Sequence, residues 1–356
     1  MIKKLKLINF RNFQNREFFF SESKNYIIWN NWKWKTNILE SLSLLTWNSI
    51  TGINFENLVK SDETFFHTEI ENFKESNLVI FYDKENNKKK YSINKKTTTK
   101  KKFWEISLKS VVFSPTTMNM FVLWPSLRRD FLDSVLLSSY PEYDKILKNY
   151  KKSLLNRNKV LKNISKNKSE LSEINFWDDD FIKNSVLVYE YRNKIINFLK
   201  NNSNNLINSF WWKIEEIEFN YISKIDINFV GSADLQTLQK NIKKYLKQNL
   251  QKDIILKTTS IWPHRDDFNL IINWNINLVD FASRWETKTV ILWLKNLEIQ
   301  FIEEETKRKP ILIIDDLLSE LDEKHKNLFI DSIEWYQTFI SWIRLEIERK
   351  WTIITL

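Results

Sequence analysis

A lysine and a threonine stand side by side, as Lys35 and Thr36, in the segment YIIWNNWKWKTNILE at residues 26–40. Such a pair between a strand and a helix is typical of a phosphate-binding loop, in which the lysine reaches the β- and γ-phosphates and the hydroxyl binds Mg²⁺. That loop follows G-x-x-x-x-G-K-[ST], because backbone N–H groups surround the phosphates and a Cβ would block their approach. Here Trp29 and Trp34 hold the two glycine positions. Taken literally, the segment is a lysine-bearing turn before an ordinary helix.

Glycine is nearly absent from the chain, and tryptophan is abundant. The 356 residues include 2 Gly and 16 Trp, whereas an average composition of about 7% would supply roughly 25 glycines. We hypothesise that UGA codons, which specify glycine in some genetic codes and tryptophan in others, are written here as tryptophan. The alternative is a genuinely Trp-rich protein. With glycine restored, residues 29–36 read G-N-N-G-K-G-K-T, and the helix near Thr36 points its positive end at the anion. The ATP-binding loop is then Trp29, Asn30, Asn31, Trp32, Lys33, Trp34, Lys35 and Thr36.

Two aspartates end an apolar run in KPILIIDDLLSELDEKH, residues 309–325. This pattern predicts a buried strand that delivers carboxylates at its C-terminal end. We predict that Asp315 binds Mg²⁺ and that Asp316 orients or deprotonates an attacking water, so that Lys35 and Asp316 are the catalytic residues. The alternative is an ordinary strand that ends in a solvated Asp pair. Asp315 follows Lys35 by 280 residues, so a large insertion must separate the two halves of the site.

Two further motifs lie between these segments. In DFASRWETKTVILWLKNLEIQF, residues 280–301, Ser283 precedes a predicted helix. Ser283 is a candidate for a second anion-binding residue and for a helix N-cap, and it can have both roles together. In TTSIWPHRDDFNLIIN, residues 258–273, a turn with surface charges is the favoured interpretation. A metal site at His264 with the two following aspartates is disfavoured, because no partner ligand is evident.

The order of patterns along the chain is strand-rich, helical and again strand-rich. Strands are predicted at 2–8 and 25–28, and residues 76–113 indicate strands around a lysine-rich loop. Long helices dominate from 126 to 252, and strand-like runs return after 253. We therefore expect a discontinuous head, residues 1–125 and 253–356, interrupted by a helical arm, residues 126–252. The predicted helices have apolar faces, made by Ile38, Leu39, Leu42 and Leu45 in one and by Val290, Ile291, Leu294, Leu297 and Phe301 in the other.

The charge balance favours an anionic partner. The net charge is +10 and the isoelectric point is about 9.3, which is a weak indication of nucleic-acid binding. Within the lysine-rich segment 84–102 we single out Lys88, Lys89 and Lys90 as DNA contacts, against the simpler reading of a solvated face. If that segment does not bind, the alternative is a surface around Arg128, Arg129 and Arg157. The chain has no cysteine and no apolar run of about 18 residues, so a cytoplasmic protein without membrane contact is expected.

Taken together, the motifs resemble the RecF family of bacterial recombination-mediator ATPases, relatives of the SMC-type heads. The resemblance covers essentially the whole chain. It rests on LKLINFRNF, IIWNNWKWKTNILESLSLLTWNS, VVFSP with LWPSLRRDFLD, NRNKVL, FWDDDF, WPHRDDF, ASRWETKT and ILIIDDLLSELD. Where the family has glycine, this chain has tryptophan, which supports the decoding hypothesis independently of composition. Those positions are Trp29, Trp32, Trp34, Trp47, Trp124, Trp262 and Trp285.

The resemblance implies an α/β fold: an ABC-type P-loop ATPase head with an inserted helical arm. It implies ATP and Mg²⁺ as cofactors, and an ATP-sandwiched homodimer in which Ser283 contacts the γ-phosphate held by the other subunit and Asp322 lies at the interface. It also implies binding to duplex DNA near single-strand gaps, and recombinase loading with RecR- and RecO-type partners. The predicted activity is a weak DNA-dependent ATPase that resets a DNA clamp. The alternative, if the tryptophans are real, is a non-hydrolysing DNA-binding scaffold with a dead nucleotide site.

Overall fold

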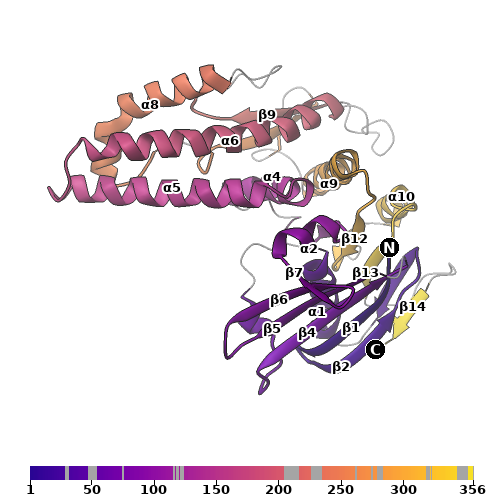
Figure 1. Ribbon diagram of the computed structural model, residues 1–356. Coiled ribbons are helices and arrows are strands. Elements are labelled where there is room, and N and C mark those ends of the chain that lie inside the picture. The colour runs from indigo at the N-terminus through magenta and orange to yellow at the C-terminus, as the bar shows by residue number, and fades with distance from the viewer. Residues whose placement is uncertain are drawn as a thin grey trace. The chain divides into compact units, whose positions relative to one another are not determined.

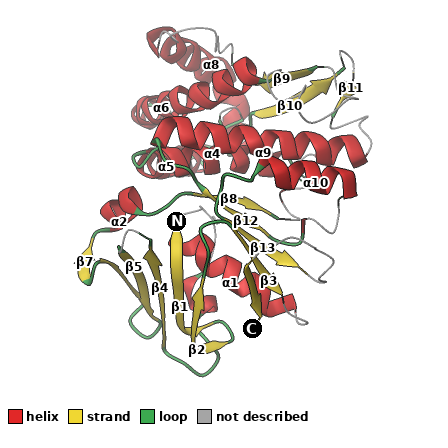
Figure 2. Ribbon diagram, turned by 90° about the vertical axis from the view of Figure 1, so that its right-hand side faces the viewer, coloured by secondary structure: helices red, strands yellow, loops and turns green. Residues whose placement is uncertain are grey.

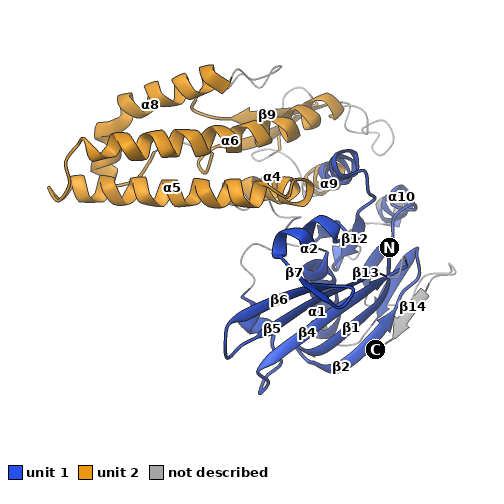
Figure 3. Cartoon of the chain, viewed as in Figure 1, with its two compact units in different colours: residues 1–119, 294–356 blue, residues 120–293 orange. Residues whose placement is uncertain are grey.

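The computed structural model describes most of the chain (Figure 1). The described residues are 1–28, 32–46, 54–73, 76–114, 117, 120, 124–203, 216–225, 235–260, 263–273, 276–278, 284–317, 321, 323–342 and 352–355. They form two compact units: Met1–Asn119 together with Leu294–Leu356, and Met120–Trp293 (Figure 3). Among these residues, no helix combines the length and apolar character needed to cross a membrane.

The first unit contains a six-stranded antiparallel sheet. Its strands alternate between buried and more exposed residues, as expected when one face of a sheet packs on a core and the other meets water. In β4 and β5, for example, every second side chain is buried. The strand order is β2 (Phe13–Phe19), β1 (Ile2–Phe10), β4 (Phe65–Asn72), β5 (Asn77–Asp83), β6 (Lys88–Ile93) and β7 (Lys96–Thr98).

The second sheet of this unit is parallel and has five strands (Figure 2). In order, they are β14 (Thr352–Thr355), β3 (Lys24–Ile28), β13 (Thr338–Trp342), β12 (Ile311–Ile314) and β8 (Ser110–Phe113). β13 pairs with β3 on one side and with β12 on the other. All four residues of β12 are apolar and buried, which is the usual composition of a parallel strand covered on both faces.

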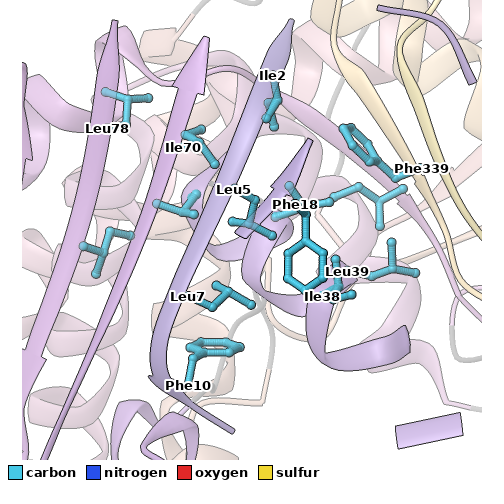
Figure 4. Close-up of a cluster of buried hydrophobic side chains, with 14 of the residues drawn as sticks. Ile2, Leu5, Leu7, Phe10, Phe18, Ile38, Leu39, Ile70, Leu78 and Phe339 are labelled. Carbon is cyan, nitrogen blue, oxygen red and sulfur yellow. The ribbon is translucent and has the colours of Figure 1, made fainter. Parts of the chain in front are cut away.

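Helix α1 (Trp32–Leu45) lies between the two sheets and contacts strands of both. The predicted apolar face is confirmed, since Ile38, Leu39, Leu42 and Leu45 are all buried. They join side chains from both sheets in one hydrophobic cluster, which includes Leu5 and Phe339 (Figure 4). Gln337 adds two hydrogen bonds to Ile2, each 2.6 Å long. Its side-chain oxygen accepts from the Ile2 N–H, and its side-chain N–H donates to the Ile2 carbonyl. The core therefore fixes α1 with respect to the parallel strands.

In the described part of the first unit, the sheets are joined by further helices, one of which crosses the boundary of the unit. They are η1 (Phe55–Leu58), α2 (Lys100–Ile106), α9 (Arg284–Thr306) and α10 (Glu323–Ser332). The division between the units falls within α9. Its five predicted apolar residues are all buried, but so are Leu292, Trp293 and Ile299 between them. The helix is thus buried around most of its circumference, a broader burial than the one-sided pattern predicted.

The second unit consists of helices and a small sheet. The helices are α4 (Pro125–Ser139), α5 (Tyr143–Ile164), α6 (Glu173–Asn202) and α8 (Leu235–Leu256), all within or next to the predicted arm. The strands β9 (Ile217–Ile222), β10 (Asp267–Ile272) and β11 (Ile276–Asn277) pair antiparallel. Because β10 pairs with both β9 and β11, the compact unit extends to Trp293, beyond the boundary at 252 drawn from sequence. The assignment of the two units to a head and an arm stays a prediction.

The lysine-rich segment differs from the predicted loop. Residues 88–93 form β6, 96–98 form β7, and α2 begins at Lys100. The two strands meet in a tight turn at Asn94 and Lys95, both with positive φ, which suits a two-residue hairpin. Residues 88–93 form a strand and not a loop because they pair with β5. Tyr91 and Ile93 alternate toward the core, but the lysines around them hide this alternation in the sequence.

The alternative DNA surface around Arg128, Arg129 and Arg157 is wrong for two of its three members. Arg157 is fully buried and donates to Asp178 at 2.7 Å and to Asp253 at 2.8 Å. Arg128 is 4% exposed and makes two hydrogen bonds to the carboxylate of Asp267. Both guanidinium groups are buried and form hydrogen bonds to carboxylates within the second unit, so they are not available to bind phosphates.

Replacing Arg157 by methionine should lower the free energy of unfolding by about 3–5 kcal/mol, because the buried Asp253 carboxylate would lose its cation. Lys159→Met is the matched control on the exposed side of the same helix and should change stability by less than about 0.5 kcal/mol. Urea denaturation of both variants checks the prediction. A loss below about 1 kcal/mol for Arg157→Met would show that the buried charges are already solvated by another route.

Candidate nucleotide-binding site

The parallel sheet brings the two predicted halves of the site together. The chain leaves β3 at Ile28 and enters α1, and it leaves β12 at Ile314 and reaches Asp315 and Asp316. Because β3, β13 and β12 run parallel, their carboxyl ends meet at one edge of the sheet. Lys35 and Thr36 therefore lie near the two aspartates despite the 280 residues between them.

Asp315 is the centre of the described site. Its Oδ2 lies 3.4 Å from the hydroxyl oxygen of Thr36, and its Oδ1 accepts a 2.8 Å hydrogen bond from the hydroxyl of Ser341 on β13. Its backbone N–H donates to the carbonyl of Phe113, at the end of β8, over 2.9 Å. Asp315 is thus held from two strands, by its carboxylate to β13 and by its backbone to β8, and the carboxylate faces the start of α1.

The electrostatics of the site are those of partly buried, opposed charges. Burial raises the pKa of Asp315, while hydrogen bonds from Ser341 and Thr36 act in the opposite direction. Lys35 is 1% exposed, and burial lowers the pKa of its ammonium group against the attraction of Asp316 and Asp315. An anion placed here would gain a desolvated cation, and a divalent cation would gain a carboxylate and a hydroxyl. These hard oxygen ligands fit Mg²⁺.

Asp316 has a left-handed backbone, with φ of 52°. Aspartate tolerates this conformation better than most residues, but it remains uncommon outside glycine. The Asp316 N–H donates to the hydroxyl of Ser341 at 2.9 Å. The chain therefore turns sharply at the end of β12, between the two carboxylates.

The turn between β1 and β2, in the motif FRNF, fastens α1 from its other side. Arg11 makes two 2.8 Å hydrogen bonds to the carboxylate of Glu40, and Asn37 donates to Asn12 at 2.7 Å. The pairing with Glu40 raises the pKa of the Arg11 guanidinium group. In the sequence this motif shows only a family resemblance. Its role as an anchor for the helix that carries Lys35 and Thr36 was not predicted.

The glycine-position tryptophans are only partly described. Trp29, Asn30 and Asn31 lie outside the described residues, and of Trp32 and Lys33 only the helical backbone is described. Of the tryptophans at positions 29, 32 and 34, Trp34 is the one whose side chain the structure describes. Its ring packs edge-on against Phe13, with 5.1 Å between ring centres, at the border of the core.

Helix α1 begins at Trp32, about one turn before the predicted start near Thr36. Glycine weakens a helix by about 1 kcal/mol relative to alanine, whereas tryptophan costs less. Tryptophan at positions 32 and 34 therefore favours this longer helix. Two other predicted site residues, Ser283 and Asp322, lie outside the described residues, directly before α9 and α10.

The three predicted DNA-binding lysines on β6 are exposed but not equivalent. The ammonium group of Lys89 lies 3.7 Å from the centre of the Phe55 ring, and burial lowers its pKa. Lys88 and Lys90, two residues apart, project from the opposite face of the sheet. In the register of β6 with β5, Lys88 lies opposite Asp83, and the Lys90 ammonium group lies 5.8 Å from the centre of the Phe81 ring. The ammonium group of Lys89 thus already makes a cation–π contact with Phe55 within the fold.

The motif WPHRDDF forms the expected turn at residues 263–265, and Arg265 is exposed, but the expectation of a surface charge is wrong for Asp266. Asp266 is buried and accepts hydrogen bonds from Tyr189 at 2.8 Å and Tyr221 at 3.0 Å. Burial raises the pKa of Asp266 to about 6. The Nδ1 atom of His264 lies 2.5 Å from the Tyr150 hydroxyl. No cluster of potential metal ligands occurs among the residues that the structure describes.

Comparison with known proteins agrees with this geometry. No family profile matches the chain. The DNA replication and repair protein RecF of Thermoanaerobacter sp. (strain X514) is 34% identical over 351 residues, which are 96% of this chain and 93% of that protein. The protein of the same name from Lachnoclostridium phytofermentans is 32% identical over 97% of this chain and 93% of its own length.

This chain belongs to the RecF family.

Solved RecF structures match the fold as well. The recombination mediator protein RecF of the RecFOR pathway, solved as RecF-ATPrS, gives a TM-score of 0.90 at 27% identity, covering 100% of this chain and 96% of that one. The RecF-ATP structure gives 0.85 at 27% identity, covering 98% and 93%. An SmcHead bound to the C-winged helix domain of ScpA gives 0.50 at 11% identity, covering 97% and 90%, and shows likeness of fold alone. The predicted α/β, ABC-type fold is confirmed.

His264 should make this RecF-family protein sensitive to acid. Burial, with Arg265, Arg129 and Arg192 nearby, lowers the pKa of His264 to about 3, so the folded state keeps the ring neutral while the unfolded chain takes up a proton below about pH 6.5. Stability is therefore lost as pH falls. Between pH 7 and pH 5 this group alone should cost about 2 kcal/mol.

The variant His264→Gln, which keeps an acceptor for Tyr150, should lose less stability than the parent over that range. Urea denaturation at pH 7 and pH 5 measures the difference. Identical losses in the two proteins would contradict the assignment.

Proposed function

We propose that this RecF-family chain is an ATP-dependent DNA-binding protein of recombinational repair. In this proposal it binds Mg²⁺-ATP, dimerises around the nucleotide, and hydrolyses it slowly in the presence of DNA. One observation carries the proposal. Lys35, Thr36 and Asp315, from two segments far apart in sequence, converge at one edge of the parallel sheet with Asp316 beside them.

The residues have separate roles in this reaction. The buried Lys35 ammonium group would neutralise the β- and γ-phosphates, and the Thr36 hydroxyl and the Asp315 carboxylate would hold Mg²⁺. When bound, the metal supplies charge neutralisation on the phosphate oxygens. Asp316, fixed in its left-handed turn, would orient or deprotonate the attacking water. Ser283 and Asp322 would act across the dimer interface.

The relatives support the nucleotide and the biological setting. Structures at 27% identity over nearly the whole chain are those of RecF-ATP and RecF-ATPrS, and they are described as a recombination mediator in the RecFOR pathway. We therefore propose RecO- and RecR-type partners and duplex DNA near single-strand gaps as the substrate, in the cytoplasm. A non-hydrolysing scaffold with a dead nucleotide site is not favoured, because the similar structures are those of RecF-ATP and RecF-ATPrS.

The decoding hypothesis forms part of this proposal. Two described tryptophans occupy positions where an indole contributes little. Trp124 is 70% exposed at the N-cap of α4 and makes no capping hydrogen bond, and Trp335 is 73% exposed in the turn after α10. Glycine is well suited to both kinds of position.

Two forms of the full-length chain test the nucleotide site: the printed sequence, and a form with glycine at 29, 32 and 34. The glycine form should bind Mg²⁺-ATP and dimerise with it, because its loop allows backbone N–H groups to reach the phosphates. The printed form should bind at least about 100-fold more weakly. Isothermal titration and sedimentation measure both properties, with Lys35→Ala in the glycine form as the control that lacks the phosphate-binding cation. Equal ATP affinity of the two forms would refute the decoding hypothesis.

Lysines 88 and 90 should contribute more to DNA binding than lysine 89. Replacing Lys88 and Lys90 together by glutamine should weaken binding to all duplex sequences alike and reduce the salt slope of log K by up to about two, since each lost phosphate contact accounts for about 0.9. Lys89→Gln is the matched control on the same strand and should change the slope little. Binding is measured by fluorescence anisotropy at several salt concentrations. An unchanged slope in the double variant would show that β6 presents only a solvated face.

A further inference from the structure

We propose that Ser341 is a positioning residue for ATP hydrolysis, which sets the orientation of both Asp315 and Asp316. This inference rests on the proposed function and concerns the same site. Ser341 lies on β13, the strand between β3 and β12, and is 3% exposed. Its hydroxyl is the only group on β13, among the described residues, for which the structure gives hydrogen bonds to both members of the acidic pair.

The direction of the two hydrogen bonds follows from the available protons. The backbone N–H of Asp316 is only a donor, so the Ser341 oxygen must accept its 2.9 Å hydrogen bond. The single hydroxyl proton is then free to be donated to Asp315 Oδ1, 2.8 Å away. A carboxylate with one oxygen held in this way turns its other oxygen, Oδ2, toward the Thr36 hydroxyl. One serine thus fixes which oxygen of Asp315 faces the predicted metal position.

The same hydroxyl supports the unusual backbone of Asp316. With φ of 52°, the Asp316 N–H leaves the direction of the strand ladder and points at β13. A buried backbone N–H without a partner is rare in folded proteins, because it loses its hydrogen bond to water. Ser341 provides that partner. Without it, the turn that separates the two carboxylates would lose one of its constraints.

The sequence contained a weak sign of this role. In QTFISW, residues 337–342, a serine interrupts a short apolar strand that is buried throughout its described positions. Serine has no special preference for strands, and a buried hydroxyl is costly unless it is hydrogen-bonded. Only the parallel pairing of β13 with β12 shows what the hydroxyl serves.

The test uses a pair of isosteric variants in the full-length chain with glycine at 29, 32 and 34. Ser341→Thr keeps the hydroxyl, and Ser341→Val has the same shape and β-branching without it. We expect Ser341→Thr to retain kcat within about 3-fold. We expect Ser341→Val to lower kcat by about 10- to 100-fold, the range for a hydrogen bond to a charged group, with the Kd for ATP changed by less than about 3-fold.

Two controls separate a positioning role from a general loss of structure. Ser110→Ala removes another buried serine of the same sheet, which accepts a hydrogen bond from Thr46 and lies opposite Ile311, at the end of β12 away from the two aspartates. Its kcat per folded molecule should equal that of the parent. Amide hydrogen exchange at Asp316, measured without nucleotide, should be faster in Ser341→Val than in Ser341→Thr.

The outcomes are distinct. If the parent does not hydrolyse ATP, the proposed function fails, and the exchange rates at Asp316 alone decide the inference. If the parent is active and the valine and threonine variants have equal kcat, Ser341 has no positioning role. If Ser341→Val does not fold, Ser341→Ala takes its place with the same expected loss and the same contrary result.

Discussion

The parallel pairing of β13 with both β3 and β12 is the constraint on which the site depends. It places the carboxyl ends of two strands from opposite ends of the chain at one edge of the sheet, on either side of β13. The elements that leave those ends carry the lysine, the threonine and the two aspartates. A parallel arrangement needs long connections, because each strand must return to the same edge before it can run in the same direction. Such a connection needs at least about a dozen residues. The separation of 280 residues between Lys35 and Asp315 far exceeds this minimum and leaves room for an entire second unit. The apolar cluster around α1 then converts this topology into a defined position for Lys35 and Thr36, since the helix is packed against both sheets.

Charge burial follows different rules in the two units. In the second unit, buried arginines are matched by carboxylates and tyrosines: Arg192 makes two hydrogen bonds of 3.0 and 3.1 Å through one nitrogen to Asp133, and Asp266 is enclosed by tyrosine hydroxyls. Such groups carry a large desolvation cost that only complete pairing offsets, so they are expected to fix the packing of α4, α6 and β10 rather than to react. At the edge of the parallel sheet, by contrast, Lys35 and Asp315 are partly desolvated with pKa values that burial moves toward the neutral forms. Charged groups whose pKa values burial shifts in this way are typical of functional sites.

Sequence patterns predicted most of the first unit and only part of the second. The pattern of apolar residues within each segment is enough to predict several elements. These are β1, β3, α1 and the strand that ends before Asp315. The same reasoning failed for Asp266 and for Arg157, since polar residues in sequence carry no sign of the partners that will bury them. The hairpin of β6 and β7 was concealed by lysines, whose long side chains are compatible with a loop or with the exposed face of a strand. Ser341 was missed for a related reason: its importance lies in a contact between strands 25 residues apart, and no local pattern reports it.

The scarcity of glycine has two consequences that the structure separates. Left-handed backbone positions favour glycine, yet eleven described residues other than glycine have positive φ, and none of them is tryptophan. Five are asparagine and two are aspartate, the residues that tolerate this conformation best, so ordinary turns in this chain are made without glycine. A low glycine content is therefore compatible with ordinary turns, and by itself it is weak support for misread glycines. The phosphate-binding loop poses a different requirement, because there the side chain itself must be absent for the backbone to approach the anion, and asparagine offers no substitute. The hypothesis of misread glycines thus depends on positions 29, 32 and 34, where tryptophan conflicts with the chemistry that Lys35, Thr36 and Asp315 are placed to perform.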